Sequence, residues 1–188
     1  MAHAVPAEVE AKLLVPRGAD LRALGRLRQV GDLRLVSRGT RRLHTRYLDT
    51  ADFALARQGV ALRVRRSGRR WELTAKWQGS VEGLIHRRPE LTVPLAAEPR
   101  GRFRLSDPDL HVLLAARIAG RPLRVVLVSD IVRHVLDVLP GDAGEDAAVL
   151  AEVALDRVHL HGEGGGPQAR YGELEIEQRA GSVADIEA

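Results

Sequence analysis

The chain lacks cysteine and is poor in aromatic residues, and both shortages narrow its chemistry. Without cysteine it can form no disulfide, no thiolate metal site and no cysteine nucleophile. Aromatic residues make up 3% of the 188 residues, which argues against base stacking as a main binding mode. No apolar run approaches the roughly 20 residues that a bilayer-spanning helix needs.

Lysine is also scarce, because Lys12 and Lys76 are the only two lysines among 29 basic residues. An ammonium group is a compact point charge, whereas the guanidinium group of arginine is a flat fork of donors. We therefore expect lysine to be kept only where arginine will not serve. Both lysines lie in segments that read as β-strands, in phase with glutamates two or four residues earlier.

The composition is typical of one globular domain, with 45% hydrophobic residues, 29% charged residues and a net charge of +4. The N-terminus shows no basic-then-apolar signal pattern, so a cytoplasmic protein is expected. We assign a single domain to residues 1–180. Residues 181–188 are either a frayed tail or the truncated start of a helix or of a covalently linked second domain.

Alternating polar and apolar residues predict eight strands joined largely by short turns, which favours an antiparallel sheet. The predicted strands are residues 6–15, 42–48, 60–66, 71–77, 84–95, 124–138, 149–161 and 170–178. Three helices are predicted, over 20–28, over 50–59 with Thr50 as a cap, and from Pro108 onward after Ser106-Asp107.

Charge alternates along nearly every predicted strand. Glu8, Glu10 and Lys12 share one face, and three glutamates of segment 173–177 share another. A sheet with one solvated face alternates in the same way. However, acidic and basic residues segregate between strands, and in-phase glutamates repel unless a cation faces them. A barrel with this face inward would hold a wet, charged interior.

These segments together resemble the CYTH domain, the triphosphate tunnel metalloenzymes. The resemblance spans residues 8–178 and rests on ordered motifs: Glu8-x-Glu10-x-Lys12, Tyr47-Leu48-Asp49-Thr50, Leu62-Arg63-Val64-Arg65, Thr74-x-Lys76, Arg88-x-Glu90, Arg133, Asp156 and Glu173-Leu174-Glu175-Ile176-Glu177. It implies a mainly β, α+β fold: an eight-stranded antiparallel closed barrel, or tunnel, with helices outside. It also implies a triphosphate-bearing substrate and Mg²⁺ or Mn²⁺.

The resemblance further implies roles for individual residues. The groups expected to bind the triphosphate are Lys12, Arg63, Arg65, Lys76, Arg88 and Arg133, of which Lys12, Lys76 and Arg133 are expected to be catalytic. The expected metal ligands are Glu8, Glu10, Glu90, Asp156, Glu173, Glu175 and Glu177. One departure is Thr92, where the family often shows a second glutamate after Glu90.

The expected function is metal-dependent hydrolysis of the terminal phosphoanhydride of inorganic tripolyphosphate or an organic triphosphate. A class IV-type adenylate cyclase is one alternative, although segment 3–7 lacks the His-Phe pair of such relatives. A non-catalytic polyphosphate-binding module is another. We expect a monomer or homodimer with no specific nucleic-acid partner and no membrane. His159 and His161 share one strand face and read as a surface pair.

Overall fold

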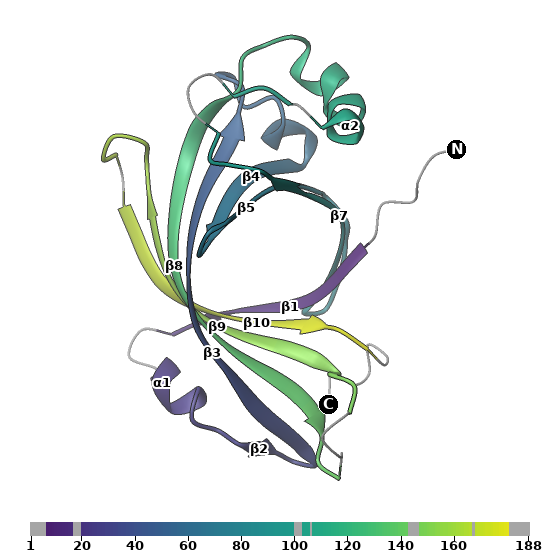
Figure 1. The fold of residues 1–188 in the computed structure, drawn as a ribbon, viewed down its shortest axis with the longest axis vertical. Coiled ribbons are helices and arrows are strands. Elements are labelled where there is room, and N and C mark those ends of the chain that lie inside the picture. The colour runs from purple at the N-terminus through teal and green to yellow at the C-terminus, as the bar shows by residue number, and fades with distance from the viewer. Residues whose placement is uncertain are drawn as a thin grey trace.

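Eight antiparallel strands close into a ring, as Figure 1 shows for the computed structural model. The structure describes residues 7–16, 20–99, 103–105, 107–142, 147–166 and 168–180. The strands of the ring are β1 (Ala7–Val15), β3 (Leu33–Asp49), β4 (Val60–Ser67), β5 (Arg70–Trp77), β7 (Ile85–Leu95), β8 (Arg124–Pro140), β9 (Ala151–His161) and β10 (Gln168–Gln178). Their order around the ring is β1-β10-β9-β8-β3-β4-β5-β7, and β1 pairs again with β7.

The strand that closes the ring is β1. On one side it pairs with β10, where Lys12 lies opposite Glu175, and on the other it pairs with β7, where Glu8 lies opposite Arg88. In Figure 1 the purple β1 runs beside the yellow β10 and continues to β7. Closure therefore places the charged face of the first strand beside the charged faces of two strands far away in the sequence. The predicted closed barrel is confirmed.

The remaining elements lie off the ring. Two short strands, β2 (Gln29–Val30) and β6 (Ser80–Glu82), pair with β3 and β7 respectively. The helices are α1 (Leu21–Leu24), the 3₁₀ helix η1 (Ala56–Gln58) and α2 (Pro108–Ile118). No helix in the described part of the chain is long and apolar enough to cross a membrane.

The apolar faces of the strands point outward, toward the helices. Under α2, the fully buried Leu110 and Leu114 pack in one cluster with Leu62 of β4 and Leu73 of β5. A second cluster around Leu35 of β3 includes leucines of α1. Each such leucine contributes about 2 kcal/mol when buried. Because the outer faces supply these apolar layers, the inner faces are left to charged residues.

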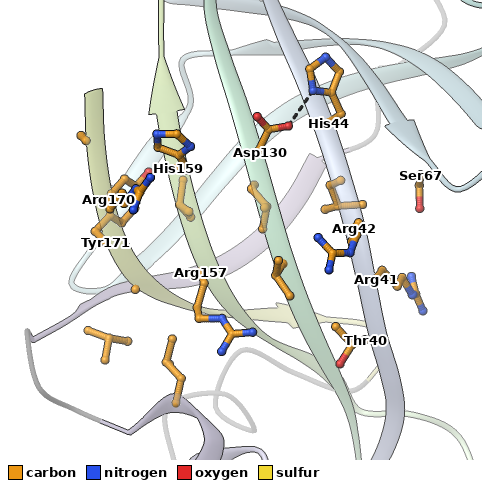
Figure 2. A pocket seen from close by; sticks show the side chains of 18 of the residues that line it. Thr40, Arg41, Arg42, His44, Ser67, Asp130, Arg157, His159, Arg170 and Tyr171 are labelled. Atoms are coloured by element: carbon orange, nitrogen blue, oxygen red, sulfur yellow. Dashed lines mark hydrogen bonds and ion pairs between the residues drawn. The ribbon is translucent and has the colours of Figure 1, made fainter. Parts of the chain in front are cut away.

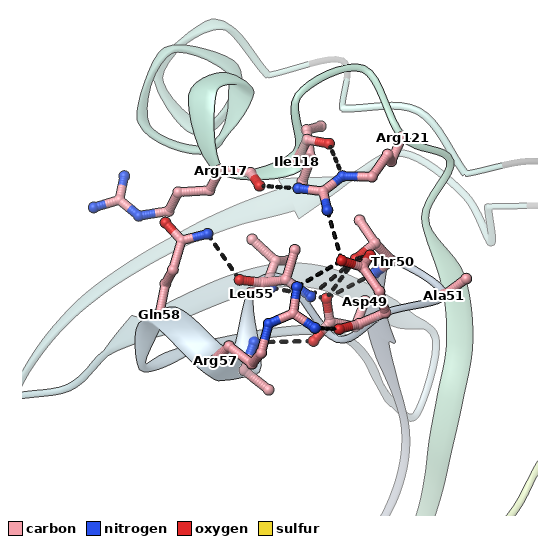
Figure 3. Close-up of polar contacts among 12 residues, drawn as sticks. Asp49, Thr50, Ala51, Leu55, Arg57, Gln58, Arg117, Ile118 and Arg121 are labelled. Atoms are coloured by element: carbon pink, nitrogen blue, oxygen red, sulfur yellow. Dashed lines mark hydrogen bonds and ion pairs between the residues drawn. The ribbon is translucent and has the colours of Figure 1, made fainter.

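Two predicted helices are shorter than expected. The helix predicted at 20–28 is the single turn of α1 followed by β2, and the helix predicted at 50–59 is reduced to η1. The cause at 50–59 is local competition for backbone N–H groups (Figure 3). Asp49 accepts hydrogen bonds from the N–H groups of Leu55 and Ala56, each at 2.9 Å, and Thr50 accepts one from Ala54 at 2.9 Å. Such bonds replace the helical ladder.

The strand predicted at 42–48 is also different, because β3 begins nine residues earlier, at Leu33. Strands β2 and β6 were not predicted. The start of α2 fits the prediction, since Asp107 caps it by accepting a hydrogen bond from the N–H of Leu110 at 2.9 Å. Pro6, Ser106 and segment 181–188, on which other predictions fell, lie outside the described residues.

Candidate functional site

A cavity of about 550 Å³ lies inside the ring. Most of the site residues expected from the sequence line it, and they come from strands on all sides. These are Glu8, Glu10, Lys12, Arg63, Arg65, Lys76, Arg88, Glu90, Arg133, Glu175 and Glu177. The other two contact residues that line it: Asp156 accepts a hydrogen bond from Arg133, and Glu173 is 3.9 Å from the ammonium nitrogen of Lys12. The fold thus gathers the whole expected set.

Lys76 is the centre of one charged group in the cavity. Its ammonium nitrogen lies 2.7 Å from a carboxylate oxygen of Glu90 and also contacts Glu8. Only 11% of the Lys76 side chain is exposed. Beside it, Arg88 donates to the nearly buried Glu10. This group ties β1, β5 and β7 together.

Glu175 is the centre of a second group. One of its oxygens lies 2.5 Å from Lys12 and the other 2.5 Å from Arg133. Burial opposes ionisation of Glu175, but the charges of Arg133 and Lys12 outweigh it and lower the pKa of Glu175 to about 2. Arg133 also makes a two-pronged contact with Asp156, at 2.9 and 2.7 Å. Both carboxylate oxygens of Glu175 are therefore held by cations.

Arg63 and Arg65 differ from the other cations of the cavity. Within the described residues neither has a carboxylate oxygen within 4 Å, and the Nε of Arg63 is buried without a hydrogen-bond partner. Arg65 donates to the hydroxyl of Thr45 at 3.1 Å. Burial, followed by the like charges of Arg63 and Arg133, lowers the pKa of Arg65 to about 10. An anion bound here would relieve this repulsion.

One group of carboxylates has the chemistry of a metal site. Asp156, Glu173 and Glu175 each offer an oxygen, and the three oxygens lie within 4.8 Å of one another. Burial raises the pKa of Glu173, and the negative charges of Glu175 and Asp156 add to this effect against the opposing charge of Lys12, so a further cation would be stabilised here. Mg²⁺ and Mn²⁺ prefer oxygen ligands, and Mg²⁺ commonly keeps several waters. The donor set therefore fits a hard divalent ion.

The other expected metal ligands, like Asp156, Glu173 and Glu175, contact cationic side chains in this structure. Glu8 and Glu90 contact Lys76, and Glu10 contacts Arg88. Glu177 lies 2.8 Å from Arg179. Thr92, at the position where the family often has a second glutamate, donates to Glu90 at 2.8 Å.

The model of the CYTH domain family matches residues 6–188 of this chain. The chain belongs to the CYTH family. A search of curated proteins found no match. Among solved structures, a putative adenylyl cyclase from Hippeastrum, HpAC1, described as revealing a dominant triphosphatase activity, is 16% identical with a TM-score of 0.56. The alignment covers 96% of this chain and 82% of HpAC1.

Two further solved structures share the CYTH fold seen here. The PH1819 protein of Pyrococcus horikoshii OT3 is 19% identical, with a TM-score of 0.52 and coverage of 96% of this chain and 82% of that one. A putative adenylate cyclase from Bacillus halodurans is 19% identical, with a TM-score of 0.50 and coverage of 96% and 85%. At these identities the likeness supports the fold alone.

The cavity of this CYTH domain includes charged residues that the sequence interpretation missed. Arg41 and Arg70 read as solvated residues at strand ends, but both line the cavity. The spacing along each strand could have identified them. Each arginine is an even number of residues from an inward-facing residue on the same strand, and such residues share one face. Glu152 and Arg179 also line it, 3.2 Å apart, and were not assigned to the site.

Proposed function

We propose that this CYTH protein is a divalent-metal-dependent triphosphatase that cleaves the terminal phosphoanhydride of inorganic tripolyphosphate or an organic triphosphate inside the tunnel. The observation that carries the proposal is the juxtaposition of two kinds of group. Arg63 and Arg65 are partly buried cations without a carboxylate partner in the described structure, and the Asp156–Glu173–Glu175 group nearby suits a divalent cation. A metal–triphosphate complex supplies phosphate oxygens for the arginines and a divalent cation for the carboxylates.

The cations of the cavity divide into two roles under this proposal. Arg63 and Arg65 bind phosphate oxygens through fixed, forked donors, whereas Lys12 and Lys76 act as compact point charges. Lys12 is 33% exposed while Arg133 is 13% exposed, so Lys12 is the partner of Glu175 that can turn toward a phosphate. Arg133 keeps Asp156 and Glu175 in place.

Asp156, Glu173 and Glu175 would hold the metal. When bound, a divalent ion neutralises charge on the transferred phosphoryl group and can lower the pKa of a water. The chain's own residues bind the substrate and align its phosphates for an in-line water, and the buried cations favour the negative charge of the transition state. The dominant triphosphatase activity described for HpAC1 supports this reading.

The experiment measures phosphate release from tripolyphosphate, ATP and thiamine triphosphate with Mg²⁺ or Mn²⁺, and with EDTA. We expect turnover of at least one substrate with a metal and none with EDTA. Glu175→Gln and Glu10→Gln should lose most of the activity while their circular dichroism is unchanged. Glu82→Gln, at an exposed position of β6, is the matched control.

Cyclic AMP is measured in the same samples, because a tunnel that binds triphosphates could also serve a cyclase. Formation of cyclic AMP without phosphate release would replace the proposed hydrolase with the cyclase. Tight tripolyphosphate binding without either product would identify a binding module instead. Full activity of both glutamine variants in EDTA would contradict the metal assignment.

A further inference from the structure

A row of imidazole and carboxylate groups crosses three neighbouring strands on the outer face of the ring. His44 of β3 lies opposite Asp130 of β8, and Asp130 in turn lies opposite His159 of β9. His161 follows two residues later on the same face of β9. Ile131 and Val158, next to this row in sequence, belong to the opposite, inner face. The cluster is thus separate from the tunnel site.

Asp130 links the row through both of its oxygens. One oxygen lies 2.7 Å from Nδ1 of His44, as Figure 2 shows, and the other lies 2.9 Å from Nε2 of His161. The rings of His159 and His161 are 5.2 Å apart between centroids. One ligand atom from each of Asp130, His159 and His161 lies within 4.8 Å of the others.

Further contacts fix how the two histidines of β9 present their nitrogens. Nδ1 of His161 lies 3.3 Å from the carbonyl oxygen of Gly162, and Nε2 of His159 lies 3.2 Å from the amide oxygen of Gln168. Each of these nitrogens donates its hydrogen to an oxygen, so in a neutral imidazole the other nitrogen carries the lone pair. In His161 the nitrogen with the lone pair is Nε2, which faces a carboxylate oxygen of Asp130. Two such acceptors lie this close only when a cation, either a proton or a metal ion, sits between them.

We propose that Asp130, His159 and His161 form a second metal site, for Zn²⁺ or a similar imidazole-preferring divalent ion, on the outer face of the ring. Two imidazoles and one carboxylate are a ligand set that zinc accepts, with an open position left for water. Oxygens hydrogen-bonded to the far side of each ring are the usual support of ligating histidines. His44 holds the second oxygen of Asp130 and so orients the carboxylate.

The surroundings set what this site can bind. Arg42, Arg157 and Arg170 line the same hollow as His44, Asp130 and His159, and Asp130 is its one acidic residue in the described structure. The nearby positive charges oppose a cation, so we expect weaker binding than at a structural zinc site. The all-oxygen group in the tunnel suits Mg²⁺ instead, which allows the two sites to be separated by metal type.

The test titrates Zn²⁺ into the full chain by calorimetry in a large excess of Mg²⁺, which occupies the oxygen ligands of the tunnel. We expect one equivalent of Zn²⁺ to bind with a Kd below about 100 μM. Asp130→Asn and His161→Ala should each weaken binding at least tenfold. His111→Ala, at an exposed position of α2, is the control and should bind as the wild type does.

Imidazole resonances provide a second readout that does not depend on affinity. On addition of Zn²⁺, the signals of His159 and His161 should shift and that of His111 should not. The variants change outward-facing side chains, so we expect them to fold as the wild type does. Their thermal unfolding midpoints check this. Absence of Zn²⁺ binding in the wild type, or full affinity in the double variant His159→Ala/His161→Ala, would overturn the proposal. Loss of Zn²⁺ binding in Glu175→Gln would place the ion in the tunnel and overturn it too.

Discussion

At the scale of single residues, Lys76 is held between two carboxylates from different strands. Its ammonium nitrogen sits between carboxylates of Glu8 and Glu90, and 11% of the side chain is exposed. A guanidinium group is wider and spreads its charge over a plane, so it cannot occupy the same point. Lys12 occupies a similar position between Glu173 and Glu175 but is 33% exposed.

We predict that Lys12→Arg and Lys76→Arg each lower kcat/KM by about 10- to 150-fold. This range corresponds to the loss of a hydrogen bond to a charged group, about 1.5–3 kcal/mol. The effect should be larger at Lys76, because it is more buried. Steady-state kinetics with the best substrate provide the measurement. The control is Arg26→Lys, on a side chain that is 72% exposed, which should change activity little. Wild-type kcat/KM in both lysine variants would mean that the two lysines are incidental.

Arg65 illustrates a conflict between function and stability. Its charge is buried beside Arg63 and Arg133, and this environment lowers its pKa to about 10. We predict that Arg65→Met weakens tripolyphosphate binding at least tenfold and leaves the free energy of unfolding unchanged or raises it by about 1 kcal/mol. Calorimetric titration and urea unfolding measure the two effects. A large loss of stability with intact binding would show that Arg65 is structural.

At the scale of elements, local patterns predicted most strands but not all of β3. The alternation of charged and apolar residues is local information, and it is sufficient to place Arg63, Lys76 and Glu175 on the inward faces of their strands. The strand predicted here begins at residue 42, so the first half of β3 was not predicted. The structure has a bulge there, with a register shift between Ser37 and Gly39 and a φ of 86° at Gly39. Glycine tolerates this conformation, and the strand continues.

The sequence alone does not predict which side chains contact each other across strands. Lys76 meets Glu8 across 68 positions of sequence, and Asp130 meets His44 across 86. Such contacts depend on register, and a shift of one residue would turn every side chain to the opposite face. The resemblance therefore gave a list of tunnel residues, whereas the division into paired groups and the outer histidine row required the fold.

The loop that follows β3 gives a prediction at this scale. Asp49 is nearly buried and accepts backbone hydrogen bonds from Leu55 and Ala56, both at 2.9 Å (Figure 3). We predict that Asp49→Ala lowers the free energy of unfolding by about 3 kcal/mol, because the buried N–H of Leu55 and the part-buried N–H of Ala56 lose a charged acceptor. Urea denaturation is the measurement, and Glu82→Ala on the exposed β6 is the control. A loss below about 1 kcal/mol would show that water replaces the carboxylate.

At the scale of the whole molecule, the barrel is stabilised from outside and strained electrostatically within. The apolar clusters under α1 and α2 hold the strands together. The enclosed charges perturb one another in opposite directions along a single strand. The pKa of Glu175 is lowered to about 2, whereas burial raises the pKa of Glu177 to about 7 despite the opposing charge of Arg179. At Glu175 the charges of Arg133 and Lys12 outweigh burial, whereas at Glu177 burial and the charges of Glu8 and Glu152 outweigh the charge of Arg179.

These two shifts have opposite consequences for stability. Glu175 contributes stability that is present above its ordinary pKa of 4.5 and is lost as the pH falls toward 2. Glu177 behaves in the reverse sense, because between pH 4.5 and 7 the folded protein keeps a proton that the unfolded chain has released. The free energy of unfolding that Glu177 contributes therefore falls as the pH rises through this range.

We predict that, in metal-free buffer, wild type loses about 1–2 kcal/mol relative to Glu177→Gln as the pH rises from 4.5 to 7.5. The value allows for solvent screening of a side chain that is 28% exposed. Urea unfolding of both proteins at several pH values gives the difference, in which the titration of other groups largely cancels. Glu82→Gln, which replaces an exposed glutamate, should show no comparable trend. A difference independent of pH would mean that Glu177 ionises normally, and that Arg179 outweighs the burial of its carboxyl group.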